Sequence, residues 1–207
     1  MKEEPQDIMK VITLGESGVG KTCLIRRCIN NIFEENNVST IGINFSFKQM
    51  KLKNGKTLNL KLIDTAGQEK YKALAKSYFK NVDAVLFVFA INDKESFDNI
   101  KNWINSFNEN HNGKEGIPMY LVGNKVDKER EVQKEVVEEF ICQNKYKYFE
   151  TSAKDNRGID VLFQELSEDL YQILVEAGGK NRTYRNKKLK IYKGNKSIKD
   201  DCFCTIK

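Results

Sequence analysis

The chain has 207 residues, of which 40% are hydrophobic, and its formal net charge is +6. This length suits one compact domain of about 170 residues with an appendage, and the apolar content is enough for a hydrophobic core. A single histidine and the lack of any CxxC pair exclude a zinc site built from those residue types. No signal peptide or membrane-spanning run is present in the sequence, so we expect a cytosolic compartment.

The charge is concentrated near the end of the sequence. Within residues 180–207, ten residues are basic and two are acidic, which gives this segment +8 and leaves about −2 for the rest. The segment follows Gly178-Gly179 and has no apolar periodicity, so a flexible basic tail is expected over residues 178–207. Residues 1–8 are expected to be a short extension, and the folded domain is expected over residues 9–177.

Strand-like and helical segments alternate through the expected domain. The predicted strands, in chain order, are Met9–Leu14, Asn44–Leu52, Thr57–Asp64, Asp83–Ile91, Pro118–Gly123 and Tyr148–Glu150. The predicted helices are Lys21–Asn30, Ser96–Asn110, Val132–Asn144 and Ile159–Ala177. Asn54-Gly55 between the second and third strands predicts a hairpin. The alternation of strands and helices predicts an α/β fold in three layers: a mostly parallel six-stranded sheet with one antiparallel edge strand and helices on both faces.

A glycine-rich segment joins the first strand to the first helix. Residues Gly15–Thr22, GESGVGKT, match the pattern GxxxxGK[ST] at every fixed position. Glycines let successive backbone N–H groups point at phosphate oxygens, and the helix adds the positive end of its dipole. Lys21 would reach the outer phosphates, and the Thr22 hydroxyl would ligate Mg²⁺. The residues expected to bind phosphate groups are Gly15, Ser17, Gly18, Val19, Gly20, Lys21, Thr22 and Cys23.

This segment alone does not name the nucleotide, because ATPases and small-molecule kinases use the same loop. A plain glycine turn between strand and helix is the alternative interpretation, and the complete match in the right context argues against it.

A second polar segment can select the base. Asn124-Lys125-Val126-Asp127 follows the strand expected at Pro118–Gly123, at the edge where open α/β sheets bind ligands. The Asp127 carboxylate can accept from both guanine N1–H and the guanine amine, whereas adenine lacks that amine and its N1 is an acceptor. In Ser152-Ala153-Lys154, the Ala153 N–H can meet guanine O6 and Ser152 can hold Asp127. The residues expected to bind the base are Asn124, Lys125, Asp127, Ser152, Ala153 and Lys154.

An ordinary solvated turn is the alternative for NKxD on its own, since these residue types are common in turns. The phosphate loop before it and Ser-Ala-Lys after it favour the base site.

Two further segments would respond to a terminal phosphate. Asp64 ends a predicted strand and can hold Mg²⁺ through water, and Gly67 can turn its N–H toward the phosphate. Gln68 is the expected catalytic residue, because it would orient the attacking water; a solvated turn residue is the alternative. Thr40 can place its hydroxyl on Mg²⁺ and its N–H on the γ-phosphate, so that phosphate loss would release both segments. The expected metal ligands are Thr22, Thr40 and Asp64.

These motifs carry a family resemblance. GESGVGKT, Thr40, DTAGQE, NKVD and SAK occur in the order and at the spacings of the Ras superfamily of small GTPases, which the chain resembles over about Met9–Ala177. Ile41–Phe45, Lys70-Tyr71 and Ser77–Lys80 are most similar to the Rab branch. The resemblance implies a P-loop NTPase G domain that binds GTP or GDP with Mg²⁺ and hydrolyses GTP to GDP and phosphate. It also implies a molecular switch that regulates vesicle and membrane trafficking.

The same resemblance implies roles for three aromatic residues. Phe33 would pack against the guanine ring, and Phe45 and Tyr78 would belong to an aromatic cluster that faces effectors. The chain departs from the Rab pattern at Ile63, where a tryptophan is usual, so the specificity for partners does not carry over. It has Ser17 in the phosphate loop, where Ras proteins have glycine and Rab proteins commonly tolerate small polar residues, so hydrolysis is expected to survive.

The end of the sequence reads Cys202-Phe203-Cys204 followed by three residues. It is formally a CaaX box, but Lys207 is an atypical final residue. We expect Rab-style double geranylgeranylation of Cys202 and Cys204, with two free cysteines as the alternative. Two lipids give stable anchoring where one is marginal, and the basic tail would add attraction to anionic lipid. The expected location is the cytosolic side of intracellular membranes, in exchange with cytosol. Nucleic-acid binding by the tail is disfavoured because no aromatic platform accompanies it.

No arginine stands where it would obviously supply a finger in cis, which is worth roughly 10³–10⁵ in rate. Slow intrinsic turnover is therefore expected, together with a GTPase-activating protein, a nucleotide exchange factor, a GDP dissociation inhibitor or prenylation escort, and effectors that read Thr40–Phe45 and Gly67–Phe79. The protein is expected to be a monomer. The rival functions are a phosphate-loop kinase, which would tolerate ATP, and a nucleotide-bound interaction module without hydrolysis. Trp103 is expected to be core packing, and His111 to be solvated.

Overall fold

The computed structural model describes residues 8–35, 40, 42–67, 76–111, 116–144 and 146–176. Its strands are β1 (Ile8–Leu14), β2 (Ile43–Lys51), β3 (Thr57–Thr65), β4 (Ala84–Ala90), β5 (Met119–Asn124) and β6 (Lys147–Glu150). Its helices are α1 (Lys21–Asn30), α3 (Lys94–Asp98), α4 (Ile100–Asn110), α5 (Lys134–Asn144) and α6 (Ile159–Glu176). Gln68, Cys202 and Cys204 lie outside the described residues.

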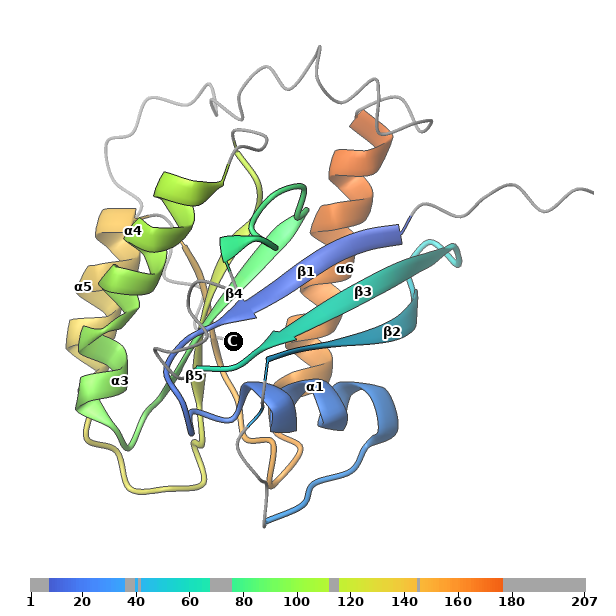
Figure 1. The fold of residues 1–207 in the computed structure, drawn as a ribbon. Helices are drawn as coiled ribbons and strands as arrows, with labels where there is room; N and C mark the ends of the chain where they lie inside the picture. The colour runs from blue at the N-terminus through green and yellow to red at the C-terminus, as the bar shows by residue number, and fades with distance from the viewer. Residues whose placement is uncertain are drawn as a thin grey trace, which may run out of the picture.

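The strands form one six-stranded sheet in the order β2-β3-β1-β4-β5-β6 (Figure 1). Only the pairing of β2 with β3 is antiparallel among these strands, and β2 lies at the edge. The turn between them is closed where the Leu52 N–H donates to the Lys56 carbonyl at 2.8 Å, and Gly55 takes a φ of 82° that suits glycine. The predicted fold class, with its one antiparallel edge strand, is confirmed.

Helices cover both faces of the sheet, as Figure 1 shows for α1 and α6 on one side and α3, α4 and α5 on the other. Two hydrophobic clusters follow from this arrangement. One joins Leu24 of α1 and Leu162 of α6 to the sheet, and the other joins Trp103 and Phe107 of α4 to the opposite face. β4 separates the two clusters, and all seven of its residues are buried because both of its faces are covered.

The segment expected as one helix over Ser96–Asn110 is two helices. The first begins earlier, because the Asp93 side chain caps it by accepting from the Ser96 N–H at 3.0 Å. At Asn99 the regular ladder is interrupted: its carbonyl accepts from the N–H groups of Asn102 and Trp103 at 3.0 and 3.3 Å. The apolar face continues through the break, so Trp103 is core packing as predicted.

The expectation that His111 is solvated is wrong. Its ring stacks on Phe107 with centroids 4.7 Å apart, and its Nδ1 lies 2.7 Å from the Phe79 carbonyl oxygen. The polar residues around His111 suggested exposure to solvent, but helix α4 places the histidine ring against the hydrophobic core. Among the described residues, the structure contains no helix with the length and apolar character that a membrane crossing needs.

Candidate functional site

A cavity of about 340 Å³ opens at the edge of the sheet where the parallel strands end. Residues that are distant in the sequence line it together. They come from the glycine-rich loop, the segment after α1, the end of β3 and the loops after β5 and β6: Ser17, Gly18, Gly20, Lys21, Thr22, Cys23, Phe33, Glu34, Glu35, Thr40, Thr65, Gly67, Asn124, Lys125, Asp127, Lys128, Ala153 and Lys154. Of the residues expected to bind the nucleotide, Gly15, Val19, Asp64 and Ser152 stand just behind this lining, and Gln68 is not among the described residues.

The loop between β1 and α1 depends on its glycines. Gly18 and Gly20 have φ of 80° and 98°, a region that favours glycine. A Cβ on Gly15 would lie 2.1 Å from the Val88 carbonyl oxygen of β4, so only glycine lets the loop lie this close to the sheet. The curled loop points its backbone into the cavity, at the N-terminus of α1, which is a favourable place for an anion.

The Lys21 side chain bonds two carbonyl groups of this loop. Its Nζ donates to the carbonyls of Gly15 and Glu16, both at 2.8 Å, and only 5% of the residue is exposed. Burial lowers the pKa of Lys21 to about 8, although Asp64 and Glu16 act in the opposite direction. An anionic ligand in the loop would favour the charged form of this amine.

Three oxygen-bearing side chains meet beside Lys21. The Thr22 hydroxyl lies 2.6 Å from the Thr40 hydroxyl and donates to Asp64 Oδ2 at 2.7 Å. The other carboxylate oxygen of Asp64 is buried and has no hydrogen-bond partner among the described residues. Burial raises the pKa of Asp64, while the Thr22 hydrogen bond and the charges of Lys21 and Arg26 lower it. Thr40, from a different segment than β3 and α1, is thus brought to the same point.

This oxygen cluster fits a hard divalent cation such as Mg²⁺. A buried carboxylate oxygen without a partner is costly, and a cation would satisfy it. No group of three or more His, Cys, Asp or Glu side chains gathers within the described part of the chain. The remaining ligands for Mg²⁺ would therefore be water and phosphate oxygens, as is usual for this ion in nucleotide sites.

The opposite side of the cavity is built from side chains that are hydrogen-bonded to one another and to the backbone. Asn124, which is 1% exposed, donates from Nδ2 to the Val19 carbonyl at 2.9 Å and accepts from the Thr151 hydroxyl at 3.2 Å. The loop after β5 is thereby tied to the glycine-rich loop. A Cβ on Gly20 would lie 2.4 Å from the Asn124 amide nitrogen, which is a second reason for glycine at that position.

Asp127 is oriented by its neighbour across the cavity rim. The Ser152 hydroxyl donates to Asp127 Oδ1 at 2.7 Å and accepts from the Asp155 N–H at 3.0 Å. A ligand with two parallel donors is the natural complement of a carboxylate held in this way. Ala153 is buried beside it, and Lys125 takes a left-handed φ of 66° at the turn that begins this loop.

Arg27 supports this side of the cavity from behind, and the sequence analysis missed it. Its Nε donates to the Ala153 carbonyl at 2.8 Å, and another guanidinium nitrogen donates to the Lys154 carbonyl at 3.0 Å. A third contact, to the Asn31 carbonyl at 2.8 Å, ties it to the end of α1. From the sequence alone, an arginine on a polar helix face is expected to be exposed to solvent. No local pattern indicates that Arg27 contacts a loop more than 120 residues later in the chain.

Two contacts of the glycine-rich loop were also missed. The Trp103 indole N–H donates to Glu16 Oε1 at 2.9 Å, so a side chain of α4 reaches the loop. A Cβ on Gly67 would lie 2.3 Å from the Glu16 carbonyl carbon and from the Ser17 nitrogen, so Gly67 packs directly on that peptide. Phe33 lines the cavity and packs partly on the α1–α6 cluster.

Comparison with known proteins agrees with this geometry. The model of the Ras family matches residues 10–172. Ras-related protein Rab-13 of Bos taurus is 38% identical over 182 residues, which cover 87% of this chain and 87% of that protein. Ras-related protein SEC4 of Candida albicans is 33% identical over 199 residues, 94% of this chain and 93% of that protein. Ras-related protein Rab-10 of Diplobatis ommata is 37% identical over 175 residues, 83% and 86% of the two chains.

Proposed function

This chain belongs to the Ras family of small GTPases and is of the Rab type, a GTP hydrolase of vesicle trafficking, and we propose that its switch works through the cavity described above. Gly15–Lys21 would hold the phosphates, and Asn124–Asp127 with Ser152–Lys154 would hold guanine. Phe33 would cover the base. The proposed nucleotide-binding domain spans residues 9–177, with the basic tail after it.

The observation that carries the assignment of the base is the Ser152–Asp127 hydrogen bond. It fixes one carboxylate oxygen and holds the carboxylate at the cavity rim, where N1–H and the amine of guanine can donate to it. Adenine would place an acceptor there and leave a charged group without a partner, which costs far more than a lost contact.

The test is binding of mant-GDP and mant-GTP in the presence of Mg²⁺, with ATP as the competitor. We expect tight binding of both guanine nucleotides and no displacement by a large excess of ATP. Equal competition by ATP would contradict the proposed base site and favour a phosphate-loop kinase instead.

Mg²⁺ is proposed to sit between Thr22, Thr40 and Asp64. When bound, this ion neutralises charge that develops on the phosphates. The chain's own contribution is to hold Thr22 and Asp64 in hydrogen-bond contact and to bring Thr40 to them from a separate segment. Thr40 contacts the cluster through its hydroxyl. If the terminal phosphate also holds Thr40, loss of that phosphate would free its segment.

Gln68 is proposed to orient the attacking water, with slow turnover that a GTPase-activating protein accelerates. Single-turnover hydrolysis by Gln68→Leu, with and without a Rab-type activating protein, tests this role. We expect the stimulated rate to fall at least a hundredfold. An unchanged rate under both conditions would favour an interaction module whose nucleotide is not hydrolysed.

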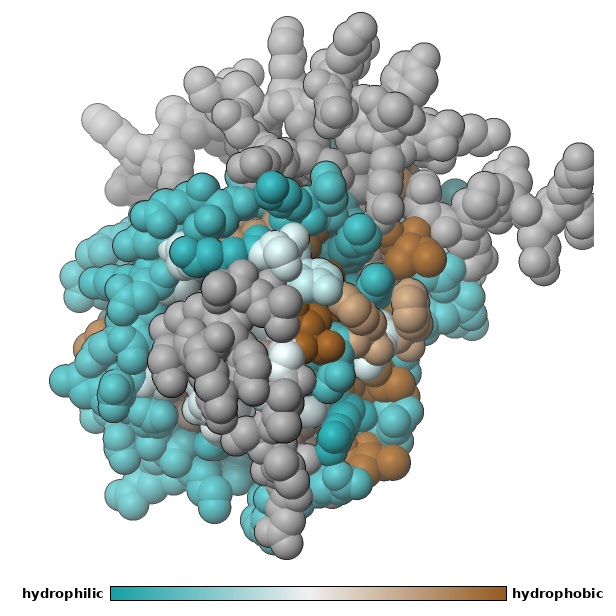
Figure 2. Space-filling view, viewed as in Figure 1, coloured by the Kyte–Doolittle hydropathy of each residue, from teal (hydrophilic) through white to brown (hydrophobic). Residues whose placement is uncertain are grey.

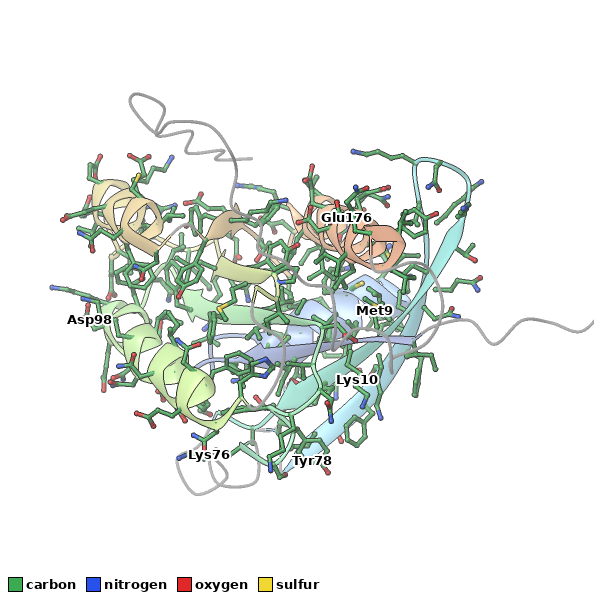
Figure 3. The ribbon with its side chains drawn as sticks, turned by 90° about the horizontal axis from the view of Figure 1, so that it is seen from above. Met9, Lys10, Lys76, Tyr78, Asp98 and Glu176 are labelled. Atoms are coloured by element: carbon green, nitrogen blue, oxygen red, sulfur yellow. The ribbon has the colours of Figure 1, made fainter. Side chains whose placement is uncertain are left out.

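The exposed part of β2 around Phe45 is proposed to belong to the effector surface, which would extend over Thr40–Phe45 and Gly67–Phe79. Phe45 is 42% exposed, and its ring lies 5.5 Å from that of Tyr78. Figure 2 shows hydrophobic residues gathered over the side of β1, β3 and β2, whereas the side of α4 and α5 is mainly hydrophilic. In Figure 3, Tyr78 lies on the other side of the sheet from Glu176 of α6, so this surface is separate from the α1–α6 layer.

Attachment to the cytosolic side of intracellular membranes is proposed to depend on two geranylgeranyl groups at Cys202 and Cys204. A GDP dissociation inhibitor or escort and an exchange factor are the further partners that such a cycle needs. The test is incubation of the full chain with a Rab prenylating system and its escort, followed by mass spectrometry. Two added lipids on the wild type and none on a Cys202→Ser, Cys204→Ser variant are expected; an unmodified wild type would contradict the proposal.

A further inference from the structure

Glu16 occupies one of the variable positions of the glycine-rich loop, yet three different elements meet at this residue. Its carbonyl accepts from Lys21 at 2.8 Å. Its peptide group lies under Gly67, where a Cβ would come within 2.3 Å. Its side chain accepts from the indole of Trp103 at 2.9 Å. Helix α1, the segment after β3 and helix α4 are therefore joined at one residue of the loop.

Trp103 is well suited to hold this peptide in place. It is 2% exposed, and it belongs to the hydrophobic cluster that also contains Phe107 and the central strands, so its ring has little freedom. The hydrogen bond runs from a neutral donor to a carboxylate, and this class is stronger than a bond between two neutral groups. A rigid donor in the core thus fixes the side chain of a residue in a loop that has no regular secondary structure of its own.

We propose that Trp103 is a positioning residue for the nucleotide site, acting through Glu16 on the shape of the phosphate loop. The Glu16 carbonyl must face Lys21 to accept its hydrogen bond, and the Glu16–Ser17 peptide must keep its position for Gly67 to pack on it. Holding the Glu16 side chain on the outer side of the loop fixes that peptide between the two contacts. This inference rests on the proposed role of Gly15–Thr22 in binding phosphates.

The same contact links α4 to the state of the nucleotide. Gly67 packs on the Glu16–Ser17 peptide, and Trp103 bonds the Glu16 side chain. If the Gly67 N–H turns toward a terminal phosphate, this movement would therefore be felt at Trp103. Trp103 is the single tryptophan of the chain, so its fluorescence reports on this point without interference from another indole. We expect its emission to differ between protein loaded with GDP and protein loaded with a non-hydrolysable GTP analogue.

The experiment measures the dissociation rate of mant-GDP, excited directly, from Trp103→Phe, Glu16→Ala and the double variant. Trp103→Phe keeps an aromatic ring in the core but removes the donor, and Glu16→Ala removes the acceptor. Each change should speed dissociation of mant-GDP about three- to tenfold. The double variant should dissociate no faster than the faster single variant, because both substitutions remove the same Trp103–Glu16 hydrogen bond. Glu16→Gln, which keeps an acceptor oxygen, should recover most of the wild-type rate.

Two controls separate positioning from a general loss of stability. Ile104→Val lies on the same helix and in the same cluster and shortens a buried side chain, so it should lower the melting temperature and leave the dissociation rate unchanged. In Glu16→Ala, the difference in tryptophan emission between the two nucleotide states should largely disappear.

The outcomes are distinct. If the wild type fails to bind mant-GDP, the proposed function fails and the inference fails with it. If the wild type binds tightly but Trp103→Phe and Glu16→Ala dissociate at the wild-type rate, or their effects simply add, the positioning role alone is overturned.

Discussion

The two halves of the nucleotide cavity are built in different ways. In the base half, made of Asn124, Asp127 and Ser152 with Arg27 behind them, the structure shows protein partners for the side chains that shape the site. In the proposed metal half, made of Thr22, Thr40 and Asp64, the hydroxyls pair with one another, and one buried oxygen of Asp64 has no partner in the described part of the chain. The base half is held in place by hydrogen bonds within the protein, whereas the proposed metal half leaves a carboxylate oxygen that a cation would bind.

This difference has a functional meaning. A network held together by the protein itself keeps its shape when the ligand changes, so the proposed base half would recognise guanine in both nucleotide states. A cluster that depends on a cation and a phosphate changes when either one leaves, which is the requirement for a switch. Lys21 stands between the halves, with a pKa lowered to about 8 by burial, and its charge is favoured when phosphate is bound.

The largest effect is expected when the base half is broken at Asp127. Asp127→Asn replaces one acceptor by a donor that faces the donors of guanine, so affinity for GDP should fall by about 10²–10⁴-fold. Xanthine carries a carbonyl where guanine carries the amine, so binding of xanthosine diphosphate should rise. Competition against mant-GDP measures both effects. Asp155→Asn removes the same charge nearby, from a side chain that lies 3.6 Å from Arg157, and should leave both affinities unchanged.

The next effect concerns the metal half. Chelation of Mg²⁺ should speed mant-GDP dissociation by about 10²-fold, because a divalent ion contributes several kcal/mol of charge neutralisation. Thr22→Val should also speed mant-GDP dissociation, and chelation of Mg²⁺ should speed dissociation from this variant only a little further. Thr13→Val provides the control, since Thr13 is buried and bonds the Ile63 carbonyl at 3.1 Å, outside the cavity. Full additivity of chelation and Thr22→Val would show that this hydroxyl is not a metal ligand.

The sequence could predict features that depend on short motifs or on periodicity, but not contacts between distant segments. Residues within one short motif, such as Gly15–Thr22, were predictable because local geometry and spacing define their chemistry. The order of strands and helices was predictable from apolar periodicity, and it brings Asn124 and Ser152 to one edge. The Asn99 break was not predictable, because the apolar face runs through it without a change of period. Arg27 and Trp103 were not, because their roles depend on contacts between distant segments.

Arg27 tests whether the base half depends on its support from α1. Arg27→Ala removes the donors to the carbonyls of Ala153 and Lys154, so mant-GDP dissociation should speed about tenfold. This effect should add to that of Mg²⁺ chelation if the halves are independent. The control is Lys147→Ala, whose side chain is 52% exposed and pairs with Asp169 at 2.5 Å, outside the cavity lining. Exposed pairs of this kind contribute little, so no change in the rate is expected.

The smallest effect is expected at Ser152, and it separates orientation from recognition. Ser152→Ala removes the hydroxyl that holds Asp127 but leaves the carboxylate, so affinity for GDP should fall only about threefold and ATP should still fail to compete. Ser167→Ala is the matched control. This serine is also fully buried, and its hydroxyl donates to the Phe163 carbonyl within α6, away from the cavity, so it should affect only thermal stability. If ATP competes in Ser152→Ala, then the position of the carboxylate rather than its charge excludes adenine, and the base half recognises its ligand by geometry that the Ser152 hydroxyl supplies.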